Sequence, residues 1–248
     1  MTARISMWSG PRNVSTALMY SFRQRSDTVV VDEPLYGHYL KATGAEHPGA
    51  AEVMADVELD AARAVEGMLH GHSEREVVFF KNMAHHLRGL DSACRDRLFS
   101  GGLSHALLIR DPREMLPSLA RVLERPRLVD TGLVEQCEIL EREVEAGRDP
   151  VVIDSRDLLR DPPGALRKLC ERLGLGFESE MLSWPRGPKP EDGVWAAHWY
   201  ASVHRSVGFA THRPPSEPFP EELSDLLEEC RPYYARLAER TTGMSHKS

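Results

Sequence analysis

Short apolar runs of strand length recur along the chain, and stretches with helical periodicity separate them. The runs span residues 5–8, 29–31, 77–80, 106–109 and 151–153 and are rich in Val and Ile. Continuous apolar runs of this length are typical of strands that are buried on both faces of a parallel sheet. The alternation of strands and helices therefore predicts a three-layer α/β fold, in which a central parallel β-sheet of about five strands is flanked by helices.

The helical periodicity is clearest in three stretches. Val14, Leu18 and Phe22 follow one another at four-residue spacing, and apolar residues between 166 and 173 form a second stripe. Apolar residues from 220 to 240 fall on one side of a predicted last helix, whose acidic start suits the helix dipole.

Length and composition exclude several classes of protein. The 248 residues suit one α/β domain, and we expect residues 1–248 to form a single domain with a disordered tail at residues 241–248. Hydrophobic residues make up 41% of the chain and charged residues 28%, which excludes a disordered chain or a coiled coil. The formal net charge of −7 argues against nucleic acid as a partner, so any anion site must be local.

The sequence shows no apolar run near the roughly 18 residues that a membrane span needs, and its first residues lack the apolar stretch of a signal peptide. We therefore expect a cytoplasmic protein without a membrane partner.

The four cysteines are separated by 33 to 60 residues, and no group of histidines has metal-ligand spacing with a third partner. The sequence predicts no metal site.

The first predicted strand runs directly into the loop Gly-Pro-Arg-Asn-Val-Ser-Thr at residues 10–16, after which helical periodicity begins. Backbone N–H groups converge at such a junction, and the helix dipole adds positive potential. Ser15 and Thr16 add hydroxyl groups and Arg12 adds a cation, so the loop predicts a phosphate site. Helix capping by Ser15 or Thr16 is the structural alternative, but it leaves Arg12 unexplained.

The loop is not a Walker A motif. After Gly10 that motif requires Gly, Lys and Ser or Thr where this chain has Ser15, Thr16 and Ala17. The difference disfavours a kinase that uses ATP and Mg²⁺, with Asp32 as a metal ligand, but that reading stays open as an alternative.

A second signal follows the fourth predicted strand. Asp111 is expected to cap the next helix, with Pro112 as its first residue and Glu114 as its capping-box partner. Capping explains neither Arg110 nor Ser118. A guanidinium group at a strand end and a hydroxyl group on the following helix predict a second phosphate site.

Together these elements resemble the sulfotransferases that use 3'-phosphoadenylyl sulfate (PAPS). Residues 11–17 are similar to the family's PKSGTTW loop, which binds the 5'-phosphosulfate, and Arg110 with Ser118 matches its RDPxxxxxS element, which holds the 3'-phosphate. Lys189 and the residues after it partly match the late RKGxxGDW element. The resemblance implies a P-loop NTPase-like sulfotransferase fold and a PAPS-binding set of Gly10, Pro11, Arg12, Asn13, Val14, Ser15, Thr16, Arg110, Ser118 and Lys189.

The chain departs from the family pattern at several positions. Arg12 replaces the usual Lys, Val14 and Pro190 replace glycines, and Met83 stands where the cytosolic steroid and phenol enzymes have a catalytic His. Since Val tolerates a positive φ poorly, we expect Asn13 to take any left-handed position in the loop. These departures leave open a non-catalytic protein that only binds a nucleotide such as adenosine 3',5'-bisphosphate (PAP).

The resemblance implies transfer of a sulfuryl group from PAPS to a hydroxyl or amine of a small-molecule or glycan acceptor, with PAP as the product and no metal. Arg12 and Lys81 are the expected catalytic cations, because Lys81 is predicted to terminate the third strand, where the family also has a Lys. A solvated charge is the structural alternative for Lys81.

The expected base is Glu33, which follows Arg12 by 21 residues at the end of the second predicted strand. Glycan sulfotransferases have a Glu at a similar place, and partial burial there raises the pKa of a carboxyl group toward a useful value. His85 and His86 are the alternative bases, and Asp32 is expected to cap or tie the turn.

Aromatic residues near 36–39 and 199–209 belong to the acceptor pocket or to the core. No motif predicts the acceptor or the oligomeric state.

Overall fold

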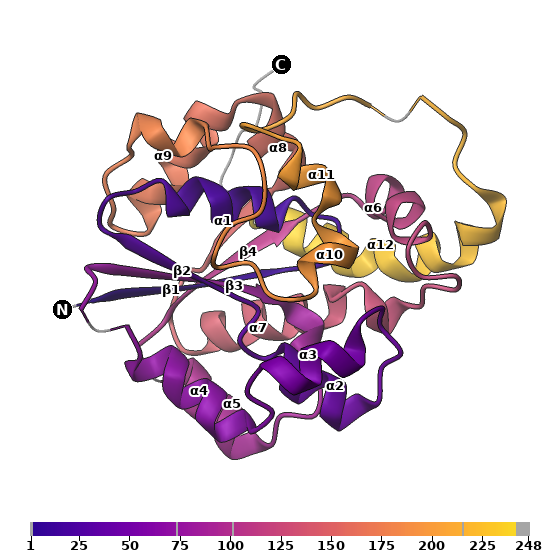
Figure 1. Ribbon diagram of the computed structural model, residues 1–248. Coiled ribbons are helices and arrows are strands. Elements are labelled where there is room, and N and C mark those ends of the chain that lie inside the picture. Colours follow the sequence, from indigo (N-terminus) through magenta and orange to yellow (C-terminus); the bar gives the residue numbers. More distant parts are fainter. Residues whose placement is uncertain (1, 73, 101, 215, 242–248) are drawn as a thin grey trace.

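The computed structural model describes residues 2–72, 74–100, 102–214 and 216–241. Its centre is one parallel sheet of five strands in the order β2-β3-β1-β4-β5 (Figure 1). The strands are β1 (Ala3–Ser9), β2 (Thr28–Asp32), β3 (Val77–Met83), β4 (Ser104–Ile109) and β5 (Val151–Asp154). The predicted five-stranded parallel sheet is confirmed.

Helices cover both faces of the sheet, as Figure 1 shows. The longer helices are α1 (Ser15–Arg23), α2 (Tyr36–Thr43), α3 (Ala50–Asp56), α4 (Ala61–His70), α5 (Ser92–Ser100), α6 (Pro112–Leu119), α7 (Leu133–Glu145), α8 (Ser155–Arg160), α9 (Pro162–Arg172) and α12 (Ser224–Ala238). The shorter ones are α10 (Ala196–Trp199), α11 (Ala201–His204) and the 3-10 turns η1 (Ala84–Leu87), η2 (Leu128–Asp130), η3 (Ser179–Leu182) and η4 (Glu221–Leu223).

The three layers follow from the alternation of side chains along each strand. Phe79 and its neighbours on one face pack against α1, α8 and α9, whereas Phe80 and its neighbours on the other pack against α4, α5, α6, α7 and α12. A smaller cluster joins α2 and α3 to α10. Each strand is therefore apolar on both faces, as the continuous runs predict.

Three predicted boundaries differ from the structure. Strand β3 continues through Lys81 to Met83, so Lys81 lies inside the strand and pairs with Met7 on one side and Asp32 on the other. The last α-helix begins at Ser224 rather than at 220, because residues 221–223 form a 3-10 turn. Thr241 forms a bridge with Val152, so the predicted tail does not begin there, and residues 242–248 lie outside the described residues.

The carboxyl ends of all five strands meet at one edge of the sheet, where open α/β sheets bind ligands. The chain passes from β3 on one side of β1 to β4 on the other, so β1 marks the point at which the winding reverses. In the part of the chain that the structure describes, no helix is both long enough and apolar enough to cross a membrane.

Candidate active site at the carboxyl edge of the sheet

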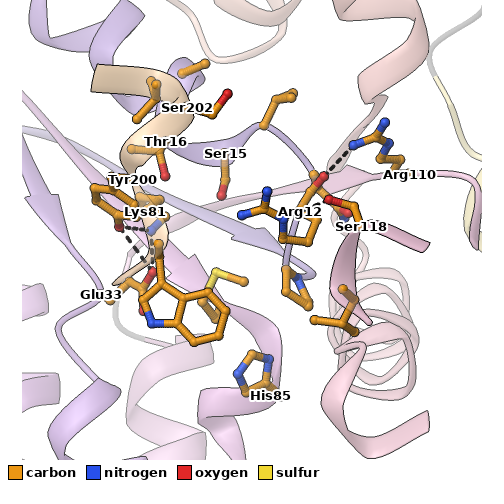
Figure 2. Close-up of a pocket in the computed structure, with 18 of the residues that line it drawn as sticks. Arg12, Ser15, Thr16, Glu33, Lys81, His85, Arg110, Ser118, Tyr200 and Ser202 are labelled. Atoms are coloured by element: carbon orange, nitrogen blue, oxygen red, sulfur yellow. Dashed lines mark hydrogen bonds and ion pairs between the residues drawn. The ribbon is translucent and has the colours of Figure 1, made fainter. Parts of the chain in front are cut away.

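A cavity of about 300 Å³ opens at this edge (Figure 2), a size within the usual range of ligand pockets. The loop after β1, the ends of β2, β3 and β4, and helices α10 and α11 line it. It brings together ten of the predicted site residues: Pro11, Arg12, Asn13, Val14, Ser15, Thr16, Glu33, Lys81, Arg110 and Ser118. Gly10 and Lys189 do not line it.

The loop after β1 turns through two left-handed residues, Arg12 and Val14, each with a φ of 62°. The expectation that Asn13 takes this conformation is wrong. Asn13 is buried, and its side-chain amide donates to the carbonyl oxygen of Leu108 at 3.2 Å, which anchors the loop on β4. The left-handed conformation is therefore taken by Arg12 and Val14, on either side of the anchored Asn13. Strained backbone at a non-glycine residue costs about 1–3 kcal/mol of folding free energy for each residue.

Gly10 supports the loop from behind. A Cβ atom at this position would collide with the carbonyl oxygen of Thr131, in the segment before α7. The close approach of two backbones thus requires glycine, although Gly10 itself does not face the cavity.

The start of α1 keeps the features of an anion site. Val14 occupies its N-cap position, and no side chain caps the helix, so capping by Ser15 or Thr16 does not explain these residues. Both line the cavity, and Figure 2 shows them on the loop and first turn beside Arg12. The helix dipole therefore acts directly on the cavity.

Two arginines and a serine converge beside this loop (Figure 2). Arg12 donates from Nε to Ser118 Oγ at 3.0 Å, and Arg110 donates to the carbonyl oxygen of Arg12 at 2.7 Å, across 98 residues of sequence. Burial, with the positive charges of Arg110 and Arg121 nearby, lowers the pKa of Arg12. Grouped guanidinium groups of this kind suit a ligand with more than one negative charge.

Asp111 caps α6 as predicted, accepting from the backbone N–H of Arg113 at 2.9 Å, and Pro112 is its first residue. The capping-box role of Glu114 is wrong. Its carboxylate instead contacts Arg110 at 3.5 Å and Arg156 at 3.2 Å, and its other partner is His212. The carboxylate of Glu114 is thus directed at side chains around Arg110 rather than at the backbone of the first helical turn.

Across the cavity, Lys81 is 1% exposed and donates to Asp32 Oδ1 at 3.0 Å, to Glu33 Oε1 and to the hydroxyl oxygen of Tyr200. The hydroxyl of Tyr200 in turn donates to Asp32 Oδ2 at 2.8 Å. Asp32 therefore binds Lys81 and Tyr200 instead of tying the turn. The register of the sheet explains the contact, because Asp32 on β2 stands opposite Lys81 on β3.

Charge in this cluster does not balance when all groups are ionised, since two carboxylates share one ammonium group. Burial, which the charge of Lys81 offsets only in part, raises the pKa of Glu33 to about 7, and it also raises the pKa of Asp32. Burial acts to lower the pKa of Lys81, but the two carboxylates outweigh it and the pKa rises. A carboxyl group that titrates near neutrality beside a cavity is suited to proton transfer.

His85 and His86 are buried close to Glu33, and the Nδ1 atom of His86 lies 3.9 Å from Glu33 Oε2. Burial lowers the pKa of His85 to about 3 and that of His86 well below its usual value. Both rings are therefore neutral at physiological pH and weaker bases than Glu33.

Lys189 lies outside the cavity. Its ammonium group donates to the carbonyl oxygen of Pro185 at 2.7 Å and lies 4.9 Å from the centre of the Tyr20 ring. The residues after Lys189 do contact the Lys81 cluster. Trp195 is buried and donates from Nε1 to the hydroxyl of Tyr200 at 3.1 Å. This segment thus positions Tyr200, for which no sequence motif distinguishes a place in the pocket from one in the core.

Among the described residues, no group of three or more His, Cys, Asp or Glu side chains is arranged to hold a metal ion. The four cysteines are buried and free.

The strand order, with a loop that leads from β1 directly into α1, defines a P-loop-like α/β fold. A family model described as "Sulfotransferase domain" matches residues 3–241, so the chain belongs to the sulfotransferase domain family. The fold agrees, because the "Sulfotransferase Domain from the Curacin Biosynthetic Pathway" superimposes with a TM-score of 0.55 at 16% identity, over 93% of this chain and 98% of that one. A sulfotransferase from Alicyclobacillus acidocaldarius gives a TM-score of 0.54 at 14% identity, over 96% of each chain.

Two curated relatives from Arabidopsis thaliana are much more similar in sequence. "Branched-chain-amino-acid aminotransferase-like protein 1" is 43% identical over 93% of this chain, and protein 2 of that name is 40% identical over 98%. The matched regions are 40% and 42% of those proteins, so the chain spans about two fifths of their length. Their names describe the longer plant proteins.

Proposed function

We propose that the protein transfers a sulfuryl group from PAPS to a hydroxyl or amine of a small-molecule or glycan acceptor and releases PAP. One observation carries the proposal: a single cavity joins an anion loop and an arginine pair to a buried Lys–Glu pair. The first two suit the two phosphate-bearing ends of the donor, and the third suits activation of an acceptor.

Residues 10–16 and the first turn of α1 would hold the 5'-phosphosulfate, while Arg110 and Ser118 would hold the 3'-phosphate. Ser118 already accepts a hydrogen bond from Arg12, so one network links both anion positions. The proposal leaves Lys189 with a supporting role, since its ammonium group is bound to backbone carbonyl oxygens.

In the reaction the carboxylate of Glu33 takes the proton of the acceptor hydroxyl, whose oxygen forms a bond to sulfur. The bond between sulfur and the bridging phosphate oxygen breaks, and its electron pair leaves with PAP. Arg12 neutralises the charge that develops on that oxygen. Lys81 holds the carboxylate of Glu33 in place and supplies positive charge beside the acceptor.

A kinase mechanism fits these contacts less well. Asp32, the residue that such a mechanism would need for Mg²⁺, directs its oxygens at Lys81 and Tyr200. The loop also lacks the Walker lysine.

Turnover tests the proposal directly. Purified protein is incubated with PAPS and a panel of acceptors, and PAP is quantified by chromatography with and without acceptor. We expect acceptor-dependent release of PAP that falls at least 100-fold in Glu33→Gln and is unchanged in Glu46→Gln, an exposed control. Binding of PAP without transfer to any acceptor would instead favour a non-catalytic nucleotide-binding protein.

A further inference from the structure

The cavity has two chemically different ends. Arg12 and Arg110 lie at the end that we assign to the donor, and Figure 2 shows them on the opposite side of the cavity from Glu33 and Lys81. Beyond Glu33 the wall changes to rings, contributed by Tyr36, His47, His85, His86 and Trp199. This ring wall belongs to the part of the cavity that the donor assignment leaves unused.

The rings of the wall pack on one another and are held in place. Tyr36 stacks on His86 with ring centres 4.6 Å apart and planes 7° apart, and its hydroxyl lies 2.9 Å from Nδ1 of His47. His47 in turn meets Trp199 at 5.9 Å. Packed aromatic surfaces of this kind bind another flat or apolar group with little loss of conformational entropy.

Two ring nitrogens of the wall lack a hydrogen-bond partner, Nδ1 of His86 and Nδ1 of His85, and the first of them lies 3.9 Å from Glu33 Oε2. Nδ1 of His85 is buried and makes no hydrogen bond in the structure, although the side chain lines the cavity. A buried polar atom without a partner is costly, so a ligand group that hydrogen-bonds to it gains affinity. Burial also lowers the pKa of His85 to about 3, which keeps the ring neutral.

Asp130 adds negative charge beside the ring wall: burial lowers the pKa of His47, and the carboxylate of Asp130 offsets part of that effect. Asp130 lines the cavity, and its carboxylate accepts from the backbone N–H of Arg127 at 2.9 Å. The side chain of Arg127 lies 3.5 Å from it but is 75% exposed, so it offsets the carboxylate weakly. After burial and His47, the charges of Arg88 and Lys81 also lower the pKa of His85. Arg88 does not line the cavity, and the ammonium group of Lys81 is paired with two carboxylates.

From this arrangement we infer that the ring wall selects an acceptor alcohol with an aromatic body and a cationic or neutral charge over an anionic one. Asp130 is the charge-selecting residue, and the free ring nitrogen of His85 is a hydrogen-bond partner of the acceptor. The inference rests on the proposed function and narrows it, because acidic glycans are excluded as good acceptors.

Binding to the protein saturated with PAP tests the inference without requiring turnover. Three phenols of nearly equal size differ in charge: tyramine is cationic, 4-ethylphenol is neutral and 4-hydroxyphenylacetate is anionic. Titration calorimetry on wild-type protein is expected to give the tightest binding for tyramine and the weakest for the anion, with a ratio of at least ten.

Two variants separate the contributions. In Asp130→Asn the ratio of the dissociation constants of 4-ethylphenol and tyramine is expected to fall at least fivefold. The affinity for PAP is expected to stay unchanged. His85→Phe is expected to weaken all three phenols about 5–10-fold, since one hydrogen bond is lost, and to keep their order. The exposed control Asp225→Asn is expected to change neither. Because Asp130 lies outside the core, its variant keeps the test informative if His85→Phe does not fold.

Equal or tighter binding of the anion overturns the inference, as does a tyramine preference that survives in Asp130→Asn. Failure of all three phenols to bind the PAP complex at 10 mM also overturns it. Failure of PAP itself to bind is a different result, because it contradicts the proposed function on which the inference rests.

Discussion

Glu33 and Lys81 are joined twice, once through the backbone and once through their side chains. The N–H of Glu33 donates to the carbonyl oxygen of Lys81 at 2.8 Å, and the ammonium group of Lys81 donates to the carboxylate of Glu33. Glu33 has a φ of 45°, so its backbone leaves the direction of β2 at this residue. The double link fixes the carboxyl group of Glu33 at the cavity, where the proposed function uses it as the proton acceptor.

The pH dependence of turnover follows from this carboxyl group. Burial raises the pKa of Glu33 to about 7, and the base acts only when it is deprotonated. We expect kcat/KM to rise about tenfold per pH unit from pH 5.5 and to level off above pH 7. The apparent pKa describes the whole cluster, because Asp32 and Glu33 titrate together. A profile that is flat between pH 5.5 and 7 contradicts Glu33 as the base.

Tyr200 positions the cluster. Its hydroxyl donates to Asp32 and lies 3.4 Å from Glu33 Oε1, which acts to lower the pKa of Glu33. We expect Tyr200→Phe to lower kcat about 10–100-fold, with KM for PAPS unchanged, and to move the acidic limb of the pH profile upward. Tyr233→Phe on α12 is the matched control. An unshifted limb in Tyr200→Phe leaves the residue with a packing role only.

Removing the charge of Lys81 destabilises the fold in a pH-dependent way. In Lys81→Met the two buried carboxylates have no cation, so their folded-state pKa values rise further above the unfolded ones. A carboxyl group with a raised folded-state pKa destabilises the fold increasingly as pH rises from its unfolded pKa through its folded one. We expect a loss of about 3–5 kcal/mol at pH 8 that shrinks toward pH 5.

Urea unfolding of the wild type and Lys81→Met at both pH values measures this loss. A deficit that stays constant or grows toward pH 5 would mean that unpaired carboxylates are not its cause.

Gly10 is required by the approach of two backbones rather than by its own φ. We expect Gly10→Ala to cost about 1–3 kcal/mol because its Cβ collides with Thr131, which lowers Tm by several degrees. Gly67→Ala in α4 is the control, since a Cβ there meets no atom within 4 Å, and it is expected to raise Tm slightly. Equal Tm values for Gly10→Ala and the wild type would contradict the close contact.

Local patterns are sufficient to predict the sheet and the edge at which the site residues gather, although β3 continues past Lys81 to Met83. Apolar runs buried on both faces predict parallel strands, and parallel strands bring Arg12, Glu33, Lys81 and Arg110 to one edge whatever the details of the loops. The contacts between these residues depend on register, which no local pattern contains. The local pattern therefore predicts a turn role for Asp32, whereas its place opposite Lys81 directs it into the cluster.

The role of Tyr200 in the cluster is not predictable from the sequence, because 168 residues separate it from Asp32 and no motif surrounds it. The left-handed turns at Arg12 and Val14 have another cause that no local pattern contains. Residue preference favours Asn13, but tertiary anchoring of its amide on β4 overrides that preference. Lys189 keeps the spacing of a family element, yet its ammonium group is bound by carbonyl oxygens outside the cavity.

Thermal unfolding with PAP, compared with ATP, ADP and AMP, tests the donor site most directly. At about 100 times its dissociation constant, a ligand adds roughly 2.7 kcal/mol, or some 5–10 °C for a chain of this size. We predict stabilisation of this size by PAP alone, lost in Arg110→Ala and kept in the exposed control Arg231→Ala. Equal stabilisation by ATP, or none by PAP, would contradict a PAPS-dependent sulfotransferase.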